Sequence, residues 1–190
     1  MGRWEPDASG RLLNAAITLF TERGYEATTT AQIAERAGVT KTTLFRLFKD
    51  KPEIVFQAQD ALVGLVRTGV EEAPPDSGAV ELMIAGIRNL SRAHTEENRH
   101  IGQALGPVLE NSEELRERAA FKRAAITAAL YEAVASRIGD TRAAGMLADL
   151  GVRAYYAGYE EWVRSGDARP LIEYVLDEVA AHRDSLRALA

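Results

Sequence analysis

The chain has 190 residues, of which 46% are hydrophobic and 27% charged, as expected of a globular protein with a buried core. It has no cysteine, which excludes disulfides, thiolate metal sites and thiol nucleophiles. The net charge of −5, taken alone, argues against binding to nucleic acid. The first residues lack the apolar run of a signal peptide, and no stretch reaches the roughly 18 apolar residues of a membrane span. We therefore expect a cytoplasmic protein that makes no membrane contact.

The first predicted helix begins at Asp7 or Ser9 and ends at Arg23. Its apolar residues recur at spacings of three and four, and Gly24 follows as a C-terminal stop. The helix therefore carries an apolar stripe that has to pack against other elements. The stripe consists of Leu12, Leu13, Ala16, Ile17, Leu19 and Phe20.

The second and third predicted helices are short and are separated by a turn that contains Gly38. Thr28 or Thr29 caps the second helix, and Gln32 lies three residues after Thr29, as in a capping box. The third helix begins after Thr40, which can cap it. Two short helices joined by a three- or four-residue turn with glycine are typical of a helix-turn-helix.

The spacing around the turn fits the close crossing of such helices. Ala34, four residues before Gly38, is small enough to let the helices approach, and Leu44, six residues after it, fills the angle between them. We place the motif at about residues 30–49.

This segment is also the basic part of an acidic chain. Between Arg36 and Lys51 there are five Lys or Arg against one Asp, whereas the residues after Lys51 carry 15 basic and 22 acidic side chains. A basic face of this kind suits a polyanion, although solvated faces can carry a similar excess.

A fourth predicted helix starts at Asp50, its cap, with Pro52 in the first turn and Glu53 completing the capping arrangement. It continues to the segment EEAPPDSG, which is the best candidate for a linker. No alternating strand pattern follows, and the sequence predicts an all-α protein. The later helices are expected at about residues 78–94, 101–110, 112–138, 141–164 and 170–189.

The last two predicted helices carry more apolar residues than one buried face requires, so part of their surface is expected to meet another subunit. Tyr155, Tyr159 and Trp162 lie at positions i, i+4 and i+7 of one of them and share a face. This aromatic face is either core, a dimer contact or part of a ligand pocket. Core or dimer contact is the favoured interpretation.

Residues 11–55, RLLNAAITLFTERGYEATTTAQIAERAGVTKTTLFRLFKDKPEIV, resemble the DNA-binding domain of the tetracycline-repressor (TetR) family of bacterial transcriptional regulators. The segments LFTERGYEATT, IAERAGVTK, TLF and KDK carry the resemblance. It implies a three-helix DNA-binding domain over residues 1–51. Residues 52–190 would form a helical bundle that binds a small-molecule effector and forms a homodimer through its last two helices.

The resemblance implies a repressor that leaves its DNA when the effector binds. The target would be a double-stranded, pseudo-palindromic operator, with two recognition helices about 34 to 36 Å apart or at a longer multiple-turn spacing. Within the recognition helix, Lys41, Thr42 and Thr43 would enter the major groove, and Arg46 would reach a guanine edge or a phosphate.

Phosphate contacts are expected from threonines at the starts of the second and third helices, although these side chains could serve only as caps. Phe45 stands where the family commonly has Tyr, and Thr42 stands where Gly is frequent. Arg3 is a candidate for an adjacent minor groove, and Lys49 is interpreted as a solvated charge. The remaining expected contacts are Thr28, Thr29, Thr40 and Lys51.

The segment HTEENRH, residues 94–100, places two His and two Glu close together, but their spacing favours solvated residues at a helix end over a metal site. Phosphate-loop, zinc-protease, nucleophile-elbow and dinucleotide-binding motifs are absent from the sequence. We therefore expect no metal, no cofactor and no enzyme. Two alternatives stay open: a small-molecule-binding protein or enzyme whose N-terminal helices are structural, and an activator that needs no effector.

Overall fold

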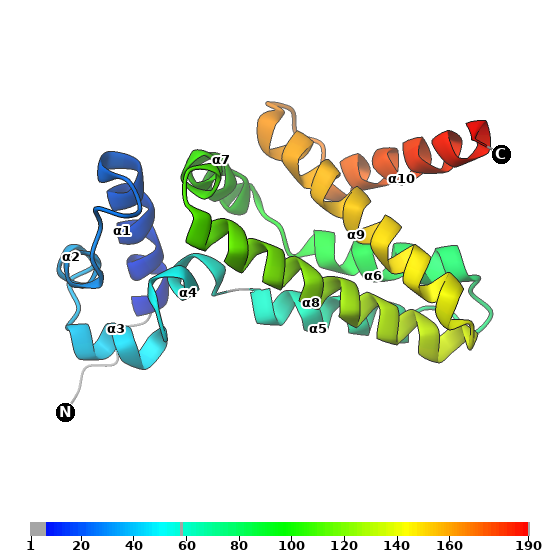
Figure 1. The fold of residues 1–190 in the computed structure, drawn as a ribbon, viewed down its shortest axis with the longest axis horizontal. Helices are drawn as coiled ribbons and strands as arrows, with labels where there is room; N and C mark the ends of the chain where they lie inside the picture. The colour runs from blue at the N-terminus through cyan, green and yellow to red at the C-terminus, as the bar shows by residue number, and fades with distance from the viewer. Residues whose placement is uncertain (1–6, 58, 190) are drawn as a thin grey trace. The chain divides into compact units, whose positions relative to one another are not determined.

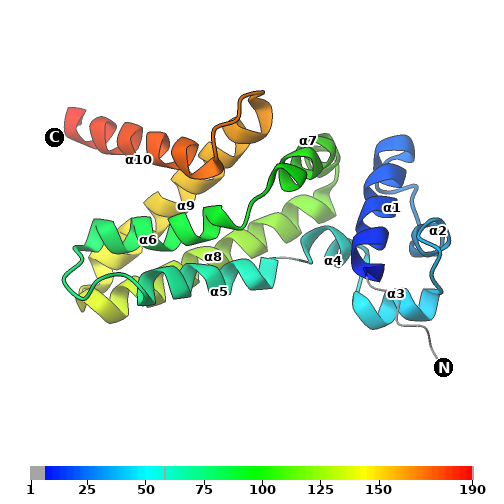
Figure 2. The same cartoon turned by 180° about the vertical axis from the view of Figure 1, so that it is seen from behind.

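The computed structural model describes residues 7–57 and 59–189, and this part of the chain is helical with no strand (Figures 1 and 2). The expected all-α fold class is confirmed. The predicted minor-groove residue Arg3 lies outside the described residues. The helices are α1 (Ala8–Arg23), α2 (Thr30–Arg36), α3 (Lys41–Leu47), α4 (Lys51–Phe56), α5 (Gln59–Glu71), α6 (Ala79–Arg92), α7 (Glu96–Glu110), α8 (Glu113–Ile138), α9 (Thr141–Arg164) and α10 (Leu171–Ala188).

The chain forms two compact units. The first contains residues 7–57 together with Ile101–Ala120, and the second contains Gln59–His100 together with residues 121–189. Helices α7 and α8 therefore each contribute residues to both units. The predicted boundary after residue 51 stays a prediction.

The first unit is built on α1, which runs as the sequence predicts. Its N-cap Asp7 accepts a hydrogen bond from the Gly10 amide at 3.0 Å, and Gly24 ends the helix in a conformation with positive φ. One face of α1 is buried and forms a hydrophobic core with side chains of α2, α3 and later helices of this unit. The core includes Leu12, Leu19, Phe20, Ile33, Leu44, Phe48, Ile54, Leu105 and Leu115.

Helices α2 and α3 begin at the predicted caps. The Thr29 hydroxyl accepts from the Gln32 amide and the Gln32 side chain accepts from the Thr29 amide, which is the expected capping box. Thr40 caps α3 by accepting from the Thr43 amide at 3.1 Å. Gly38 has a φ of 67° in the turn, a left-handed conformation that glycine adopts without steric cost.

The predicted fourth helix is described as two helices. Asp50 caps α4, accepting from the Glu53 amide at 2.8 Å as predicted, but α4 ends at Phe56 and α5 begins at Gln59. The two helices also belong to different units. The apolar pattern runs on through this point, so the sequence carries no signal for the division.

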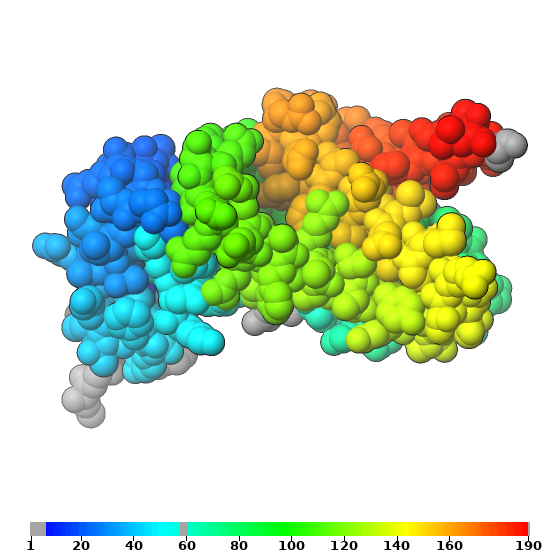
Figure 3. All heavy atoms as spheres, viewed as in Figure 1, coloured from blue at the N-terminus to red at the C-terminus, as the bar shows by residue number. Residues whose placement is uncertain are grey.

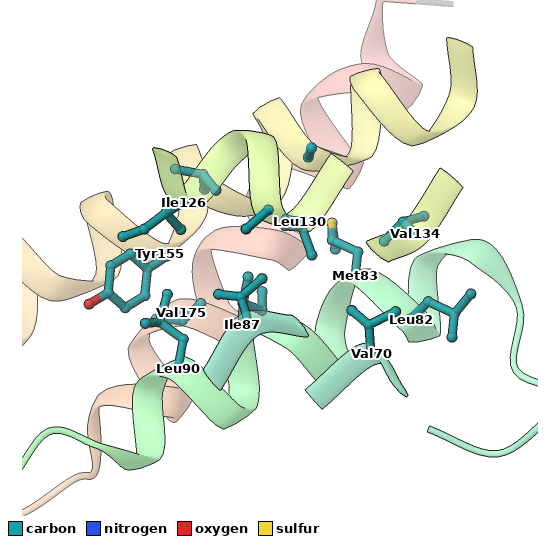
Figure 4. Packing of buried hydrophobic residues seen from close by; sticks show 14 of the residues in the cluster. Val70, Leu82, Met83, Ile87, Leu90, Ile126, Leu130, Val134, Tyr155 and Val175 are labelled. Carbon is teal, nitrogen blue, oxygen red and sulfur yellow. The ribbon is translucent and has the colours of Figure 1, made fainter. Parts of the chain in front are cut away.

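The second unit has a core of aliphatic side chains contributed by five helices (Figure 4). Helices α9 and α10 lie close together at Gly158, where an added Cβ would lie 2.7 Å from the Val175 amide nitrogen. Glycine is therefore required at this crossing. No helix in the described ranges is long and apolar enough to cross a membrane. Figure 4 labels Val70, Leu82, Met83, Ile87, Leu90, Ile126, Leu130, Val134, Tyr155 and Val175.

Helix α7 begins earlier than predicted, at Glu96 instead of about Ile101. The reason is a local cap: the Thr95 amide donates to the Asn98 side-chain oxygen at 2.8 Å, and the Asn98 amide donates back to the Thr95 hydroxyl at 3.4 Å. The segment HTEENRH thus contains a helix start.

The prediction that this segment is solvated was wrong for His94 and Arg99. The His94 ring packs at 5.5 to 6.2 Å against Tyr155, Tyr159 and Trp162, and its Nε2 lies 3.1 Å from the Tyr155 hydroxyl. Arg99 is buried with its guanidinium 4.6 Å from the Trp162 ring.

The structure bears on two interpretations: a metal site in the segment HTEENRH, and the role of the aromatic face of α9. Among the described residues, no group of His, Asp or Glu could hold a metal ion. Tyr155 and Trp162 are buried in the core, and Tyr159 is partly buried beside them. The aromatic face is therefore core, as the favoured interpretation had it, and a ligand-binding role for it stays a prediction.

The environment of His94 makes the stability of the fold depend on pH. Burial lowers the pKa of His94 below its ordinary value, so the unfolded chain binds this proton more readily than the folded one. The free energy of unfolding is expected to fall as the pH drops below about 6.5, and His94→Gln should make that fall shallower. Urea unfolding at pH 7, 6 and 5 measures the effect, with the exposed His100→Gln as the control. An unchanged pH dependence in His94→Gln would contradict the assignment.

Candidate nucleic-acid interface

One face of α3 is exposed and carries most of the predicted contact residues. Lys41, Thr42, Phe45 and Arg46 are exposed, whereas Leu44 is fully buried. Positions 41, 42, 45 and 46 share one side of a helix because one turn takes 3.6 residues. In the space-filling view the light-blue to cyan segment that includes α3 lies at the surface of the first unit (Figure 3).

Two features of this face suit binding to an anionic duplex. Phe45 is 52% exposed, which is unusual for a large aromatic side chain and leaves its ring available for a sugar or base edge. Lys41 and Arg46 make no hydrogen bond or ion pair with any described residue, and the same holds for Lys49. No described residue therefore neutralises these three charges.

One other basic residue of the segment, Arg36, is neutralised by an ion pair. Arg36 forms a two-pronged ion pair with Glu22, with N–O distances of 3.0 and 3.1 Å. The available positive charge is thus concentrated on α3 and the residues that follow it.

The predicted threonine contacts differ in where they lie. Thr29 and Thr40 are exposed at the starts of α2 and α3, where both act as caps, and the Thr43 hydroxyl lies 3.0 Å from that of Thr40. Thr28 is buried, and its hydroxyl donates to the carbonyl oxygens of Gly24 and Leu19 at 2.8 and 3.3 Å. The side chain of Thr28 therefore does not belong to the exposed face, contrary to the prediction.

Lys51 lies apart from α3, half-buried in the first turn of α4. Its ammonium donates to the carbonyl oxygens of Tyr25 and Thr28 at 2.9 and 3.2 Å and lies 3.7 Å from the centre of the Tyr25 ring. An ammonium group has three N–H donors; these two carbonyl oxygens accept from two of them, and the Tyr25 ring lies against the ammonium. The sequence pattern gives no signal for the contacts of Tyr25, because its partners Lys51 and Glu114 are distant in the chain.

The N-terminal residues that contain this face match known DNA-binding regulators in sequence. Residues 12–58 match the family described as bacterial regulatory proteins, tetR family. Over 45 residues the chain is 51% identical to the uncharacterized HTH-type transcriptional regulator YvkB of Bacillus subtilis, an alignment that covers 24% of each protein. Over 64 residues it is 39% identical to the HTH-type transcriptional activator FasR of Mycolicibacterium smegmatis, covering 34% of this chain and 29% of FasR. These matches thus span less than a third of either relative.

Among solved structures, the fold is similar to that of Thermus thermophilus FadR, a TetR-family transcriptional repressor in complex with lauroyl-CoA. The TM-score is 0.55 at 22% identity, and the match covers 90% of this chain and 91% of FadR. The likeness extends beyond the N-terminal helices and concerns the fold of both units.

Proposed function

We propose that this chain, whose N-terminal domain belongs to the bacterial tetR family, is a transcriptional regulator that binds duplex DNA and responds to a small molecule. The observation that carries the proposal is the exposed face of α3, where Lys41 and Arg46 form no hydrogen bond or ion pair with described residues and Phe45 is exposed to solvent. Unpaired positive charge beside an exposed aromatic ring on one helix face supports a polyanionic partner.

In this proposal α3 enters the major groove. Lys41, Thr42 and Thr43 approach base edges near the N-terminus of the helix, and Arg46 reaches a guanine edge or a phosphate one turn later. Backbone contacts come from Thr29 and Thr40 at their helix starts, from Phe45 packing on a sugar, and from the charged ammonium of Lys51. The residues of the proposed interface are Thr29, Thr40, Lys41, Thr42, Thr43, Phe45, Arg46 and Lys51.

We assign effector binding and dimerisation to the second unit. Large apolar side chains are exposed on its last two helices, with Met146 on α9 68% exposed and Leu186 on α10 55% exposed. Exposed side chains of this kind support a contact with a second copy. A homodimer would present two recognition helices to a pseudo-palindromic operator.

The direction of regulation is proposed as repression relieved by the effector. Of the similar proteins described above, FasR is named an activator and the Thermus FadR a repressor, so resemblance alone favours neither direction. A reporter gene behind the selected operator distinguishes them: repression predicts lower output with the protein than without it, and higher output would overturn it.

Selection of duplexes from a random pool tests DNA binding directly. We expect enrichment of a pseudo-palindrome whose affinity falls steeply with salt, by a slope of about 0.9 per phosphate contact. Because the similar FadR structure holds lauroyl-CoA, acyl-CoAs are the first effectors to add to the complex. Failure to bind any duplex at low salt would favour the alternative in which the N-terminal helices are only structural.

A further inference from the structure

Tyr25 joins three parts of the first unit. It follows the end of α1, is only 4% exposed, and its ring packs 5.0 Å from that of Phe20. The Tyr25 hydroxyl donates a hydrogen bond to the Glu114 carboxylate in the first turn of α8 at 2.6 Å. Its ring and carbonyl oxygen hold the Lys51 ammonium, as described above.

Helix α8 makes a second attachment beside Lys51. Arg118 donates to Asp50 at 2.5 Å and to Glu53 at 3.3 Å, and Asp50 is the cap of the helix whose first residue is Lys51. Between these two polar attachments, Leu115 is fully buried in the core of the first unit. The first turns of α8 are thus fastened to the turn after α1 and to the start of α4.

The hydrogen bond between Tyr25 and Glu114 is of a strong type. A hydroxyl that donates to a carboxylate forms a short, charge-assisted bond, and 2.6 Å lies in the range for such bonds. Burial, followed by the hydrogen bond to Glu114, raises the pKa of Tyr25, so the phenol keeps its proton and stays a donor. The position of the ring under Lys51 is therefore set by α8.

We propose that Glu114 and Tyr25 are positioning residues for Lys51 at the DNA-binding face. Helix α8 holds the Tyr25 ring by its hydroxyl, and the ring and the neighbouring carbonyl oxygens fix the position at which the Lys51 charge attracts a phosphate. The inference rests on the proposed function. Because α8 continues into the second unit, a change there that withdraws Glu114 would free Lys51 while α3 stays folded.

Hydrogen exchange of the full-length protein without DNA tests the attachment itself. In Glu114→Ala and in Tyr25→Phe, we expect amides of residues 24–30 and 49–57 to exchange about 5-fold faster, as loss of one hydrogen bond implies. Glu114→Gln, which keeps an acceptor, should restore part of the protection. The matched control is Glu113→Ala, since Glu113 is in the same helical turn and has no partner among the described residues.

Binding to the selected duplex tests the consequence. Glu114→Ala is expected to lower affinity about 3- to 10-fold and to reduce the salt slope by up to about 0.9, as loss of one phosphate contact predicts. Tyr25→Phe combined with Glu114→Ala should cost little more than either alone, because both remove the same bond. Circular dichroism at the assay temperature verifies that each variant is folded.

The outcomes separate this inference from the proposed function. If Glu114→Ala matches Glu113→Ala in exchange, or in affinity and salt slope, the positioning role is overturned while DNA binding by the unaltered protein stands. If the unaltered protein binds no duplex, the proposed function itself fails, and that result is obtained before any variant is compared.

Discussion

Replacing both Lys41 and Arg46 by alanine is expected to weaken binding to the selected operator about 100-fold at 0.1 M salt. Both side chains are exposed on one face of α3 and form no hydrogen bond or ion pair with described residues, so their removal is expected to leave the fold intact. Losing the base contact of Lys41 and the base or phosphate contact of Arg46 costs roughly 1.4 kcal/mol each, and the two tenfold losses multiply to this factor.

The single variants separate the two roles. Lys41→Ala, which removes a contact to a base edge, should relax the preference at one base pair. Arg46→Ala should relax the preference at another base pair if Arg46 reads a guanine edge, or weaken all sequences alike and lower the salt slope by about one if it contacts a phosphate. Fluorescence anisotropy between 50 and 200 mM salt on the selected duplex and on single-base variants distinguishes these patterns. Lys49→Ala removes the same charge from an exposed position just after α3 and is the matched control. A double variant that binds like Lys49→Ala would remove α3 from the interface.

The parts of the fold that could be predicted from the sequence depend on neighbours in the chain. The caps Thr29, Thr40 and Asp50 accept hydrogen bonds from amides three residues ahead, so type and spacing suffice to predict them. The inward position of Leu44 follows in the same way from its spacing to Gly38. Once the cap and the inward side of α3 are predicted, the opposite side of this short helix is predicted to be exposed.

The contacts of Thr28 and Lys51 within the first unit follow from tertiary packing and have no signal in the sequence pattern. From the sequence, the Thr28 hydroxyl was expected to contact a phosphate. In the structure it donates to carbonyl oxygens at the end of α1. Lys51 contacts Tyr25, 26 residues earlier, and Tyr25 contacts Glu114, 89 residues later. No periodicity or capping pattern reports such pairs, so tertiary packing decides them.

The same limit applied to the segment HTEENRH. Its composition is polar, and polar residues next to a helix end are usually solvated. Here the aromatic side chains of α9 cover His94 and Arg99, and the buried charge of Arg99 is tolerated because its donors reach carbonyl oxygens. The aromatic face of α9 and two residues of the polar segment, His94 and Arg99, thus form one cluster.

Arg99 is the residue of this cluster with the largest expected effect on stability. Its guanidinium donates to the carbonyl oxygens of Asp167 at 2.7 Å and of Arg169 at 3.3 Å, in the connection between α9 and α10. It also stacks on Trp162 and pairs with Glu96 at 3.4 Å. The side chain therefore ties the start of α7 to the α9–α10 connection, although its buried Nε has no hydrogen-bond partner and reduces the net gain.

Arg99→Ala is expected to lower the free energy of unfolding by about 3 kcal/mol, because it leaves two carbonyl oxygens without a donor and a void beside Trp162. Arg99→Lys should recover less than half of the loss, since an ammonium cannot reproduce the planar fork that reaches both carbonyls while stacking on the ring. Urea unfolding followed by Trp fluorescence measures the change. Arg92→Ala, at the exposed end of α6, should change stability by less than about 0.5 kcal/mol and serves as the control. If Arg99→Ala were as stable as Arg92→Ala, the contacts of Arg99 would be incidental to the stability of the second unit.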